Sequence, residues 1–259
     1  MEKQVLKIVK VGGKLIEKEE DMKAFLSDFS ALKGPKILIH GGGKMATEMS
    51  EKLGYKTNMV DGRRITDANA MQVITMVYAG LINKQIVAKL QSLGSNSVGL
   101  CGADGNAIIS KKREVKEIDY GFVGDIENIN TSFINSFLKQ GIAPIFSAVS
   151  SSLDGQLFNT NADSIAAELA IAFSEMYNTE LLFCFEKPGV LKDSADDASV
   201  IQVLSKQNYE ELLEEKIVSE GMLPKLLNCF YALENKVSNV LLGGKDLLQN
   251  DTLHTKITK

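Results

Sequence analysis

The protein has 259 residues, of which 44% are hydrophobic and 24% are charged, and 29 Lys and Arg against 33 Asp and Glu give a net charge of -4. This composition is typical of a globular chain with a sizeable core and excludes the disordered and fibrous classes. The acidic balance excludes a strongly basic surface, so we expect neither nucleic acid nor a membrane as a partner. The length predicts one large domain or two lobes that share a core.

Cysteine and histidine are too few for several kinds of chemistry. Cys101, Cys184 and Cys229 are far apart and form no C-x-x-C pair, which favours a reducing cytoplasmic compartment over a disulfide framework or a zinc site. His40 and His254 are the only histidines in the sequence. Two histidines leave few ways to build a histidine metal site or a His–carboxylate catalytic pair. We expect no metal held by protein side chains alone. The N-terminal segment also lacks the apolar core of a signal peptide.

Strand, glycine turn and helix follow one another twice at the start of the chain. The pattern predicts strands at 5–11 and 37–39, glycine turns at 12–13 and 41–43, and helices through 22–29 and 44–53. Two successive βα units imply a parallel sheet. The segment Ala68–Leu90 has apolar residues on nearly every face, which predicts a helix buried in the fold or against a second copy of the chain. Its polar residues leave it short of a membrane span.

The alternation of strands and helices continues to the C-terminus. We expect strands at 97–101, 106–109, 142–149, 155–159, 180–185 and 237–242, and helices at 162–173, 208–213 and 224–235. This alternation predicts an α/β fold. A second lobe is expected after Tyr177 without a separating linker, so we describe residues 1–259 as one domain with lobes 1–177 and 178–259.

Glycines between a strand and a helix bring bare backbone N–H groups close to an anion. Lys10 ends the first strand next to Gly12 and Gly13, and in open α/β sheets that end of a strand borders the ligand crevice. The alternative is an edge lysine that reaches water. Gly42 and Gly43 form a second such turn. Neither turn is a Walker A loop, because the pattern G-x-x-x-x-G-K-[ST] does not occur in the sequence.

Other polar residues suit a small acidic ligand. Arg64, expected in an irregular segment, carries the side chain best suited to bind a carboxylate through two parallel hydrogen bonds. Asn159 and Asn161 can point the same way, although Asn161 or Asp163 can instead cap the helix that follows. Lys225 opens a helix at the positive end of its dipole, an unfavourable place for a cation that a bound anion would relieve.

Taken together, these motifs resemble the amino acid kinase family. In chain order they are Lys10-x-Gly12-Gly13, His40-Gly-Gly-Gly43, Gly62-x-Arg64-x-Thr66, Ala79-Gly80-x-x-Asn83-Lys84, Gly155-Gln-Leu-x-Asn159-x-Asn161-Ala-Asp163 and Gly221-Met222-x-x-Lys225. The resemblance spans almost the whole chain and implies a three-layer αβα sandwich around a mainly parallel central sheet. It also implies ATP-dependent phosphorylation of the γ-carboxylate of N-acetyl-L-glutamate in arginine biosynthesis, with Mg²⁺ bound mainly through the nucleotide.

The resemblance further implies a role for each site residue. Lys10 and Lys225 would stabilise the transferring phosphoryl group, and Asp163 would orient both ammonium groups. The acylated glutamate would contact Gly42, Gly43, Arg64, Asn159 and Asn161. The nucleotide would contact Gly12, Gly13, Glu186, Gly189, Leu191, Ile217 and Ser219. The short stretch before the first strand implies a homodimer through Ala68–Leu90 instead of an arginine-inhibited hexamer.

Three alternatives stay open. The acyl group can be N-succinyl, with the same reaction on N-succinyl-L-glutamate. The phrase Gly41-x-Gly43-x-x-Ala46 matches the loose dinucleotide fingerprint, with Asp61 twenty residues further on, although Asp61 does not end a second strand. A non-catalytic sensor of acylated amino acids would keep the pocket without the reaction. Glu186 and Lys187 also stand where the family usually carries Asp and an apolar residue, which affects the expected nucleotide contacts.

Overall fold

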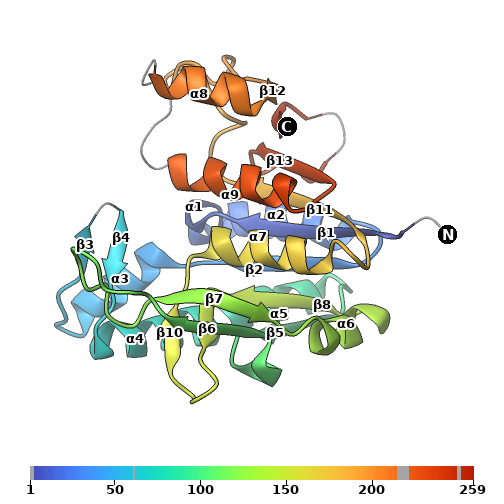
Figure 1. The fold of residues 1–259 in the computed structure, drawn as a ribbon. Coiled ribbons are helices and arrows are strands. Elements are labelled where there is room, and N and C mark those ends of the chain that lie inside the picture. The colour runs from blue at the N-terminus through green and yellow to red at the C-terminus, as the bar shows by residue number, and fades with distance from the viewer. Residues whose placement is uncertain (1–2, 61, 215–221, 250–251) are drawn as a thin grey trace. The chain divides into compact units, whose positions relative to one another are not determined.

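The structure, a computed structural model, describes residues 3–60, 62–214, 222–249 and 252–259. The chain forms two compact units, whose elements are labelled in Figure 1. Unit 1 joins Met1–Lys36 with Ala166–Lys259, and unit 2 is Ile37–Ile165. The ligand lobes expected on either side of residue 177 stay a prediction.

The strands of unit 1 follow the order β12-β14-β13-β11-β1. β1 (Val5–Val11) is the β-branched strand expected from the sequence, and it pairs in parallel with β11 (Asn178–Cys184). β11 pairs in parallel with β13 (Asn239–Gly243), which is antiparallel to β14 (His254–Ile257). β14 is parallel to the short strand β12 (Val203–Leu204). The carboxyl ends of β1 and β11 therefore meet at one edge.

Unit 1 contains five helical segments within the residues that the structure describes. They are α1 (Gly13–Glu17), α2 (Glu19–Ala31), the part of α7 (Ala162–Phe173) that belongs to this unit, α8 (Lys206–Glu214) and α9 (Leu223–Glu234), which packs beside β13 (Figure 1). Lys36 closes the end of α2, because its ammonium group donates to the carbonyl oxygens of Phe29, Ser30 and Leu32 at 2.8, 2.8 and 2.9 Å. These oxygens would otherwise lack partners at the end of a helix.

Unit 2 contains a parallel run of strands in the order β2-β8-β5. These are β2 (Lys36–His40), β8 (Ala143–Ser147) and β5 (Ser97–Leu100), and α3 (Gly43–Lys52) follows β2. A second sheet has the order β10-β9-β6-β7, with β10 (Leu157–Asn159), β9 (Val149–Ser151), β6 (Ile108–Lys112) and β7 (Gly124–Ile129). The remaining elements are the hairpin β3 (Asn58–Val60) and β4 (Arg63–Ile65), the 3₁₀ turn η2 (Asp104–Asn106) and α6 (Thr131–Lys139).

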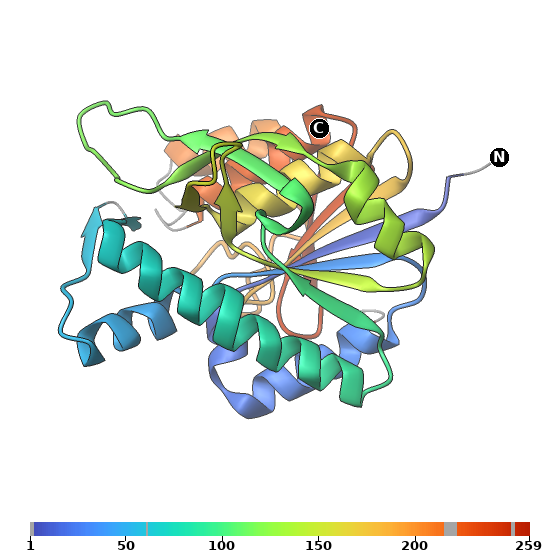
Figure 2. The same ribbon diagram turned by 90° about the horizontal axis from the view of Figure 1, so that it is seen from below.

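One long helix crosses unit 2 without a break, as Figure 2 shows. It consists of α4 (Ala68–Ile74), the π-helical segment η1 (Thr75–Ile82) and α5 (Asn83–Ser92). Asp67 caps it by accepting a hydrogen bond from the backbone N–H of Ala70 at 2.8 Å. By length and apolar composition it could cross a membrane, a test that core helices of globular proteins also pass. The helix expected over Ala68–Leu90 is confirmed.

The predicted α/β class with a mainly parallel sheet is confirmed, and most elements lie where the pattern put them. Three expectations were wrong in detail. The strand expected at 142–149 is two strands, β8 and β9, and the strand expected at 106–109 begins at Ile108 after η2. Arg64 belongs to β4 of a hairpin and not to an irregular segment.

Candidate active site

The turn after β1 lies directly against the end of β11 in unit 1. The backbone N–H of Gly12 donates to the carbonyl oxygen of Cys184 at 2.8 Å. A Cβ added to Gly12 would lie 3.3 Å from that oxygen and 3.5 Å from the Cα of Phe185, so a side chain there would crowd β11. Gly13 then begins α1. Glycine at position 12 thus permits the close approach that the sequence suggested.

The structure brings Lys10 and Lys225 to the same end of β11. Lys10 is the register partner of Phe183. The ammonium nitrogen of Lys225, in the first turn of α9, lies 5.1 Å from the ring centroid of Phe183 and 5.7 Å from that of Phe185. Burial raises the pKa of the Cys184 thiol far above its usual range, and the charges of both lysines act on it in the opposite direction. Two lysines thus lie near the end of one strand, where their positive charge would favour an anion.

Glu186 follows β11 and forms an ion pair with Lys14 of α1 at 2.7 Å. Its carboxyl is partly buried, which raises its pKa, but the hydrogen bond and charge of Lys14 and the charge of Lys225 outweigh burial and hold the pKa below the usual value. A cavity of about 620 Å³ in unit 1 opens here. Its lining includes Glu186, Phe185, Lys14, Lys245 and Gly244.

The other residues predicted to contact the nucleotide do not line this cavity in the described part of the chain. Gly189 is buried, and a Cβ there would lie 2.7 Å from the Oγ1 of Thr255 and 2.8 Å from Val200, so packing alone requires glycine at this position. Leu191 is half-buried and bridges to Val200. Ile217 and Ser219 lie outside the described residues.

The glycine turn of unit 2 lies at the start of α3. Gly43 begins the helix, and its neighbour Gly42 packs on the long helix: a Cβ at Gly42 would clash with Ile82 and lie 3.0 Å from the Cδ1 of Tyr78. The first N–H groups of an α-helix have no partner within the helix and carry a partial positive charge. The turn therefore presents backbone donors suited to a carboxylate.

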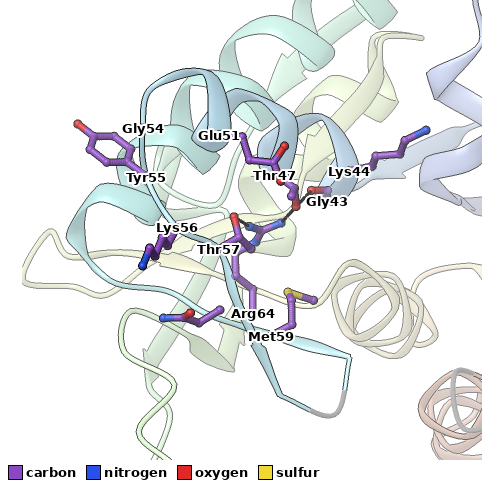
Figure 3. A pocket seen from close by; sticks show the side chains of 11 residues that line it. Gly43, Lys44, Thr47, Glu51, Gly54, Tyr55, Lys56, Thr57, Met59 and Arg64 are labelled. Carbon is purple, nitrogen blue, oxygen red and sulfur yellow. Dashed lines mark hydrogen bonds between the residues drawn. The ribbon is translucent and has the colours of Figure 1, made fainter.

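Arg64 is buried beside this turn, with 8% of its surface exposed. Its guanidinium donates to the carbonyl oxygen of Gly43 and the hydroxyl of Thr47, both at 2.8 Å, and to the hydroxyl of Thr57 at 3.2 Å (Figure 3). Gly43, Thr47, Thr57 and Arg64 line a cavity of about 840 Å³ between α3 and the β3–β4 hairpin, together with Lys44 and others. Three of the five N–H donors of an arginine are thus used for its placement.

The polar residues near β10 have two different roles: one connects β10 to a neighbouring segment, and another caps the helix that follows. Asn159 donates from its side-chain nitrogen to the hydroxyl of Thr66 at 3.0 Å, which joins β10 to the segment after β4. Asn161 accepts from the backbone N–H of Ser164 at 3.0 Å, so it does cap α7. Asp163 is half-buried in the first turn of that helix.

The predicted residues are divided between the two units. Lys10, Lys225 and Glu186 belong to unit 1, whereas Arg64 and Asp163 belong to unit 2. Within the described parts of the chain, no group of three or more His, Cys, Asp or Glu side chains could hold a metal ion. The sequence interpretation missed the role of Thr47 and Thr57, whose hydroxyl groups hold Arg64. The position of Thr47, one helical turn after the glycines, could have indicated that its hydroxyl lies near the glycine turn.

Comparison with known proteins identifies the family of the chain. The family model described as "Amino acid kinase family" matches residues 6–243. The chain is 48% identical over 240 residues to an acetylglutamate kinase of Phocaeicola vulgatus, covering 93% of each chain. It is 47% identical to an acetylglutamate kinase of Cytophaga hutchinsonii, covering 98% of each chain. The solved structure of smu.665 from Streptococcus mutans UA159 matches with a TM-score of 0.79 at 22% identity, over 98% of each chain. The chain therefore belongs to the amino acid kinase family.

Proposed function

We propose that the protein is an ATP-dependent kinase that phosphorylates the γ-carboxylate of N-acetyl-L-glutamate, as a step of arginine biosynthesis. The observation that carries this proposal is the similarity to curated relatives named acetylglutamate kinase. They are 45% to 49% identical to this chain over 92% to 98% of its length. The family model spans residues 6–243, a range that contains every motif named above.

The acidic substrate binds to unit 2 in this proposal. The guanidinium of Arg64 and the first N–H groups of α3, at Gly42 and Gly43, bind carboxylate oxygens, and Asn159 contacts the amide of the acylated amino acid. Asn161, whose side-chain oxygen caps α7, also contacts the acylated glutamate in this proposal. The γ-carboxylate has an ordinary pKa near 4.3, so it is ionised at neutral pH and attacks phosphorus without a general base.

The transferred phosphoryl group lies next to Lys10 and Lys225 in this proposal. Phosphoryl transfer needs in-line positioning and neutralisation of the charge on the equatorial oxygens more than it needs covalent catalysis. Lys10 and Lys225 supply that charge, and the carboxylate of Asp163 orients their ammonium groups. Mg²⁺, bound mainly through the nucleotide, would supply further neutralisation of the phosphate charge.

The nucleotide binds to unit 1 in this proposal. Gly12 and Gly13 place backbone N–H groups near the phosphates. Glu186, Gly189 and Leu191 contact the nucleoside from the loop after β11, with Lys14 setting the position of Glu186 through their ion pair.

We also propose that the protein works in the cytoplasm as a homodimer whose subunits meet along Ala68–Leu90. Met76 and Leu81 are large apolar side chains that are 54% and 41% exposed on this helix, which leaves apolar surface for a second copy. Light scattering should give twice the chain mass, and Leu81→Glu should shift it to the monomer. The control is Gln85→Glu, on an exposed position of the same helix. A wild-type monomer would overturn the dimer.

N-succinyl-L-glutamate is the second candidate substrate, and one observation favours it. Lys44 and Lys56 line the same cavity as Arg64, so a second carboxylate on the acyl group would find cations within that cavity. Glu51 also lines this cavity, and its negative charge would disfavour a second carboxylate.

The deciding experiment measures ADP release with Mg-ATP and each acylated glutamate in parallel. A higher kcat/KM for the acetyl compound supports the first candidate, and a higher value for the succinyl compound replaces it with the second. No turnover of either would overturn the kinase proposal in favour of a sensor. Thermal-shift binding of each compound without ATP would then reveal such a sensor.

A further inference from the structure

His40 ends β2 and is completely buried directly before the glycine turn. Its Nδ1 lies 2.9 Å from the carbonyl oxygen of Gly41, and its Nε2 lies 3.1 Å from the side-chain nitrogen of Asn83. Both ring nitrogens thus have partners, one in the turn and one on the long helix. The role proposed for the turn in binding substrate does not itself require this histidine.

The partners fix the tautomer of His40. A carbonyl oxygen only accepts hydrogen bonds, so Nδ1 carries the proton and donates it to Gly41. Burial holds the pKa of the ring at about 4, below its ordinary value, so the ring is neutral and Nε2 is an acceptor. The amide nitrogen of Asn83 therefore donates to Nε2.

Asn83 is itself held in one orientation. It is completely buried, and its nitrogen also donates to the carbonyl oxygen of Ile145 in β8 at 2.9 Å. Its oxygen accepts from the ammonium group of Lys84 at 3.1 Å, and that ammonium group reaches the carbonyl oxygen of Gly99 in β5 at 3.1 Å. A fixed amide on the helix thereby sets the position of the imidazole.

The same helix supports the turn by packing. Tyr78 and Ile82, in the π-helical segment before Asn83, lie against Gly42 so closely that no Cβ fits there. A π-helical segment inside an α-helix often occurs at a functional site. The turn is therefore held from one side by packing at Gly42 and from the strand by the hydrogen bond at Gly41.

We propose that His40 and Asn83 are positioning residues, which act as one unit to set the Gly41–Gly43 turn so that its backbone N–H groups meet the carboxylate of the substrate. This inference rests on the function proposed above. Neither side chain touches the substrate. Both act through the carbonyl oxygen of Gly41, whose orientation determines where the next two peptide planes point.

Steady-state kinetics of His40→Leu and Asn83→Leu test the proposal. Each variant should raise the KM for the acylated glutamate at least tenfold and leave the KM for Mg-ATP within twofold. The double variant should be no worse than either single one, because the two residues act in series. Loss of folded protein alone would lower the apparent kcat and leave both KM values unchanged, and that result would overturn the proposal.

The control is Gln91→Leu, which removes another amide of α5 that donates to a strand carbonyl, that of Ser97 at 2.9 Å, away from the turn. Its KM values should match those of the wild type. If His40→Leu does not fold, His40→Asn keeps a donor for Gly41 but cannot reach Asn83, and it should show the same KM pattern with a smaller change. Unchanged KM values in that variant and in Asn83→Leu would overturn the proposal.

A second measurement separates this inference from the proposed function. The ¹H–¹⁵N resonances of Gly42 and Gly43 should shift in Asn83→Leu and stay in place in Gln91→Leu, with no substrate present. If the wild type turns over neither acylated glutamate, the proposed function fails while these shifts still test the position of the turn. Unshifted resonances in a folded Asn83→Leu protein would overturn the inference whatever the substrate is.

Discussion

The guanidinium of Arg64 donates to the carbonyl oxygen of Gly43 across 2.8 Å. This contact connects β4 to the first residue of α3. The side chain that we propose binds a carboxylate is therefore held by the helix whose first N–H groups we propose bind the same carboxylate. Thr47, one turn further along α3, accepts from the same terminal nitrogen. The cation and the backbone donors are therefore fixed relative to each other before any substrate arrives, which lowers the entropy cost of binding.

Arg64→Lys should raise the KM for the acylated glutamate by roughly 10- to 100-fold, because the ammonium group of a lysine cannot replace the contacts to Gly43, Thr47 and Thr57 and also donate to a carboxylate, and each charge-assisted bond contributes about 1.5 to 3 kcal/mol. Initial-rate kinetics at saturating ATP measure it. Arg63→Lys is the matched control, since Arg63 is the exposed neighbour on β4. Equal KM values in the two variants would remove Arg64 from the substrate site.

Lys10→Met and Lys225→Met should each lower kcat by about a hundredfold to a thousandfold, the usual loss when one group that stabilises transition-state charge is removed. Circular dichroism should show an unchanged fold, because methionine keeps the unbranched apolar part of the lysine side chain at both positions. Lys7→Met, in the same strand, is the control for removal of a positive charge. A kcat near the wild-type value in both site variants would refute their assignment.

Gly42→Ala should destabilise the protein by about 1 to 3 kcal/mol, since the added methyl group overpacks against Tyr78 and Ile82. Urea unfolding measures the change. Gly41→Ala is the neighbouring control, because nothing lies within 4 Å of a Cβ built at that position. Equal stability of the two variants would show that the turn can move away from the long helix at little cost.

The free energy of unfolding should fall by about 2 kcal/mol between pH 7.5 and pH 5 through His40 alone. Burial lowers its folded pKa to about 4, aided by the charge of Lys84 and opposed by the hydrogen bond to Gly41, whereas its unfolded pKa is about 6.5. The unfolded chain therefore binds the proton first, and stability present above pH 6.5 is lost as the pH falls toward 4. Denaturant titrations of wild type and His40→Asn should converge as the pH is lowered. Parallel curves would mean that the ring titrates near its ordinary pKa.

Local patterns in the sequence located most of the long elements, although β7 and α6 were not expected. β1, α7 and α9 have clear apolar periods and identifiable starts, and the structure has them within two residues of the expected bounds. β3, β4 and β12 were not expected. Each has only two or three residues, too few to show an alternation, and each exists because a partner strand is brought to it.

The parts of the candidate site that could be predicted are those where the backbone conformation or packing restricts which residue type can occupy a position. Gly12 and Gly42 stand where a side chain would collide, and that requirement restricts the residue type. The His40–Asn83 pair leaves no such mark, because its two members are 43 positions apart and the link depends on which side of the long helix faces β2. The sequence showed only that Asn83 is a polar residue in an apolar stretch.

Unit 1 is interrupted in the chain by the whole of unit 2. When the ribosome has made residues 1–165, unit 2 is complete, but β1 still lacks β11, which begins at Asn178. Because parallel pairing of β1 with β11 closes a loop of more than a hundred residues, it is slow compared with local contacts. During synthesis unit 2 can therefore fold before β1 pairs with β11, and the edge of β1 that pairs with β11 stays open until Asn178–Cys184 has been made. An open strand edge is a template for pairing with another chain, so this edge is exposed to aggregation in that interval.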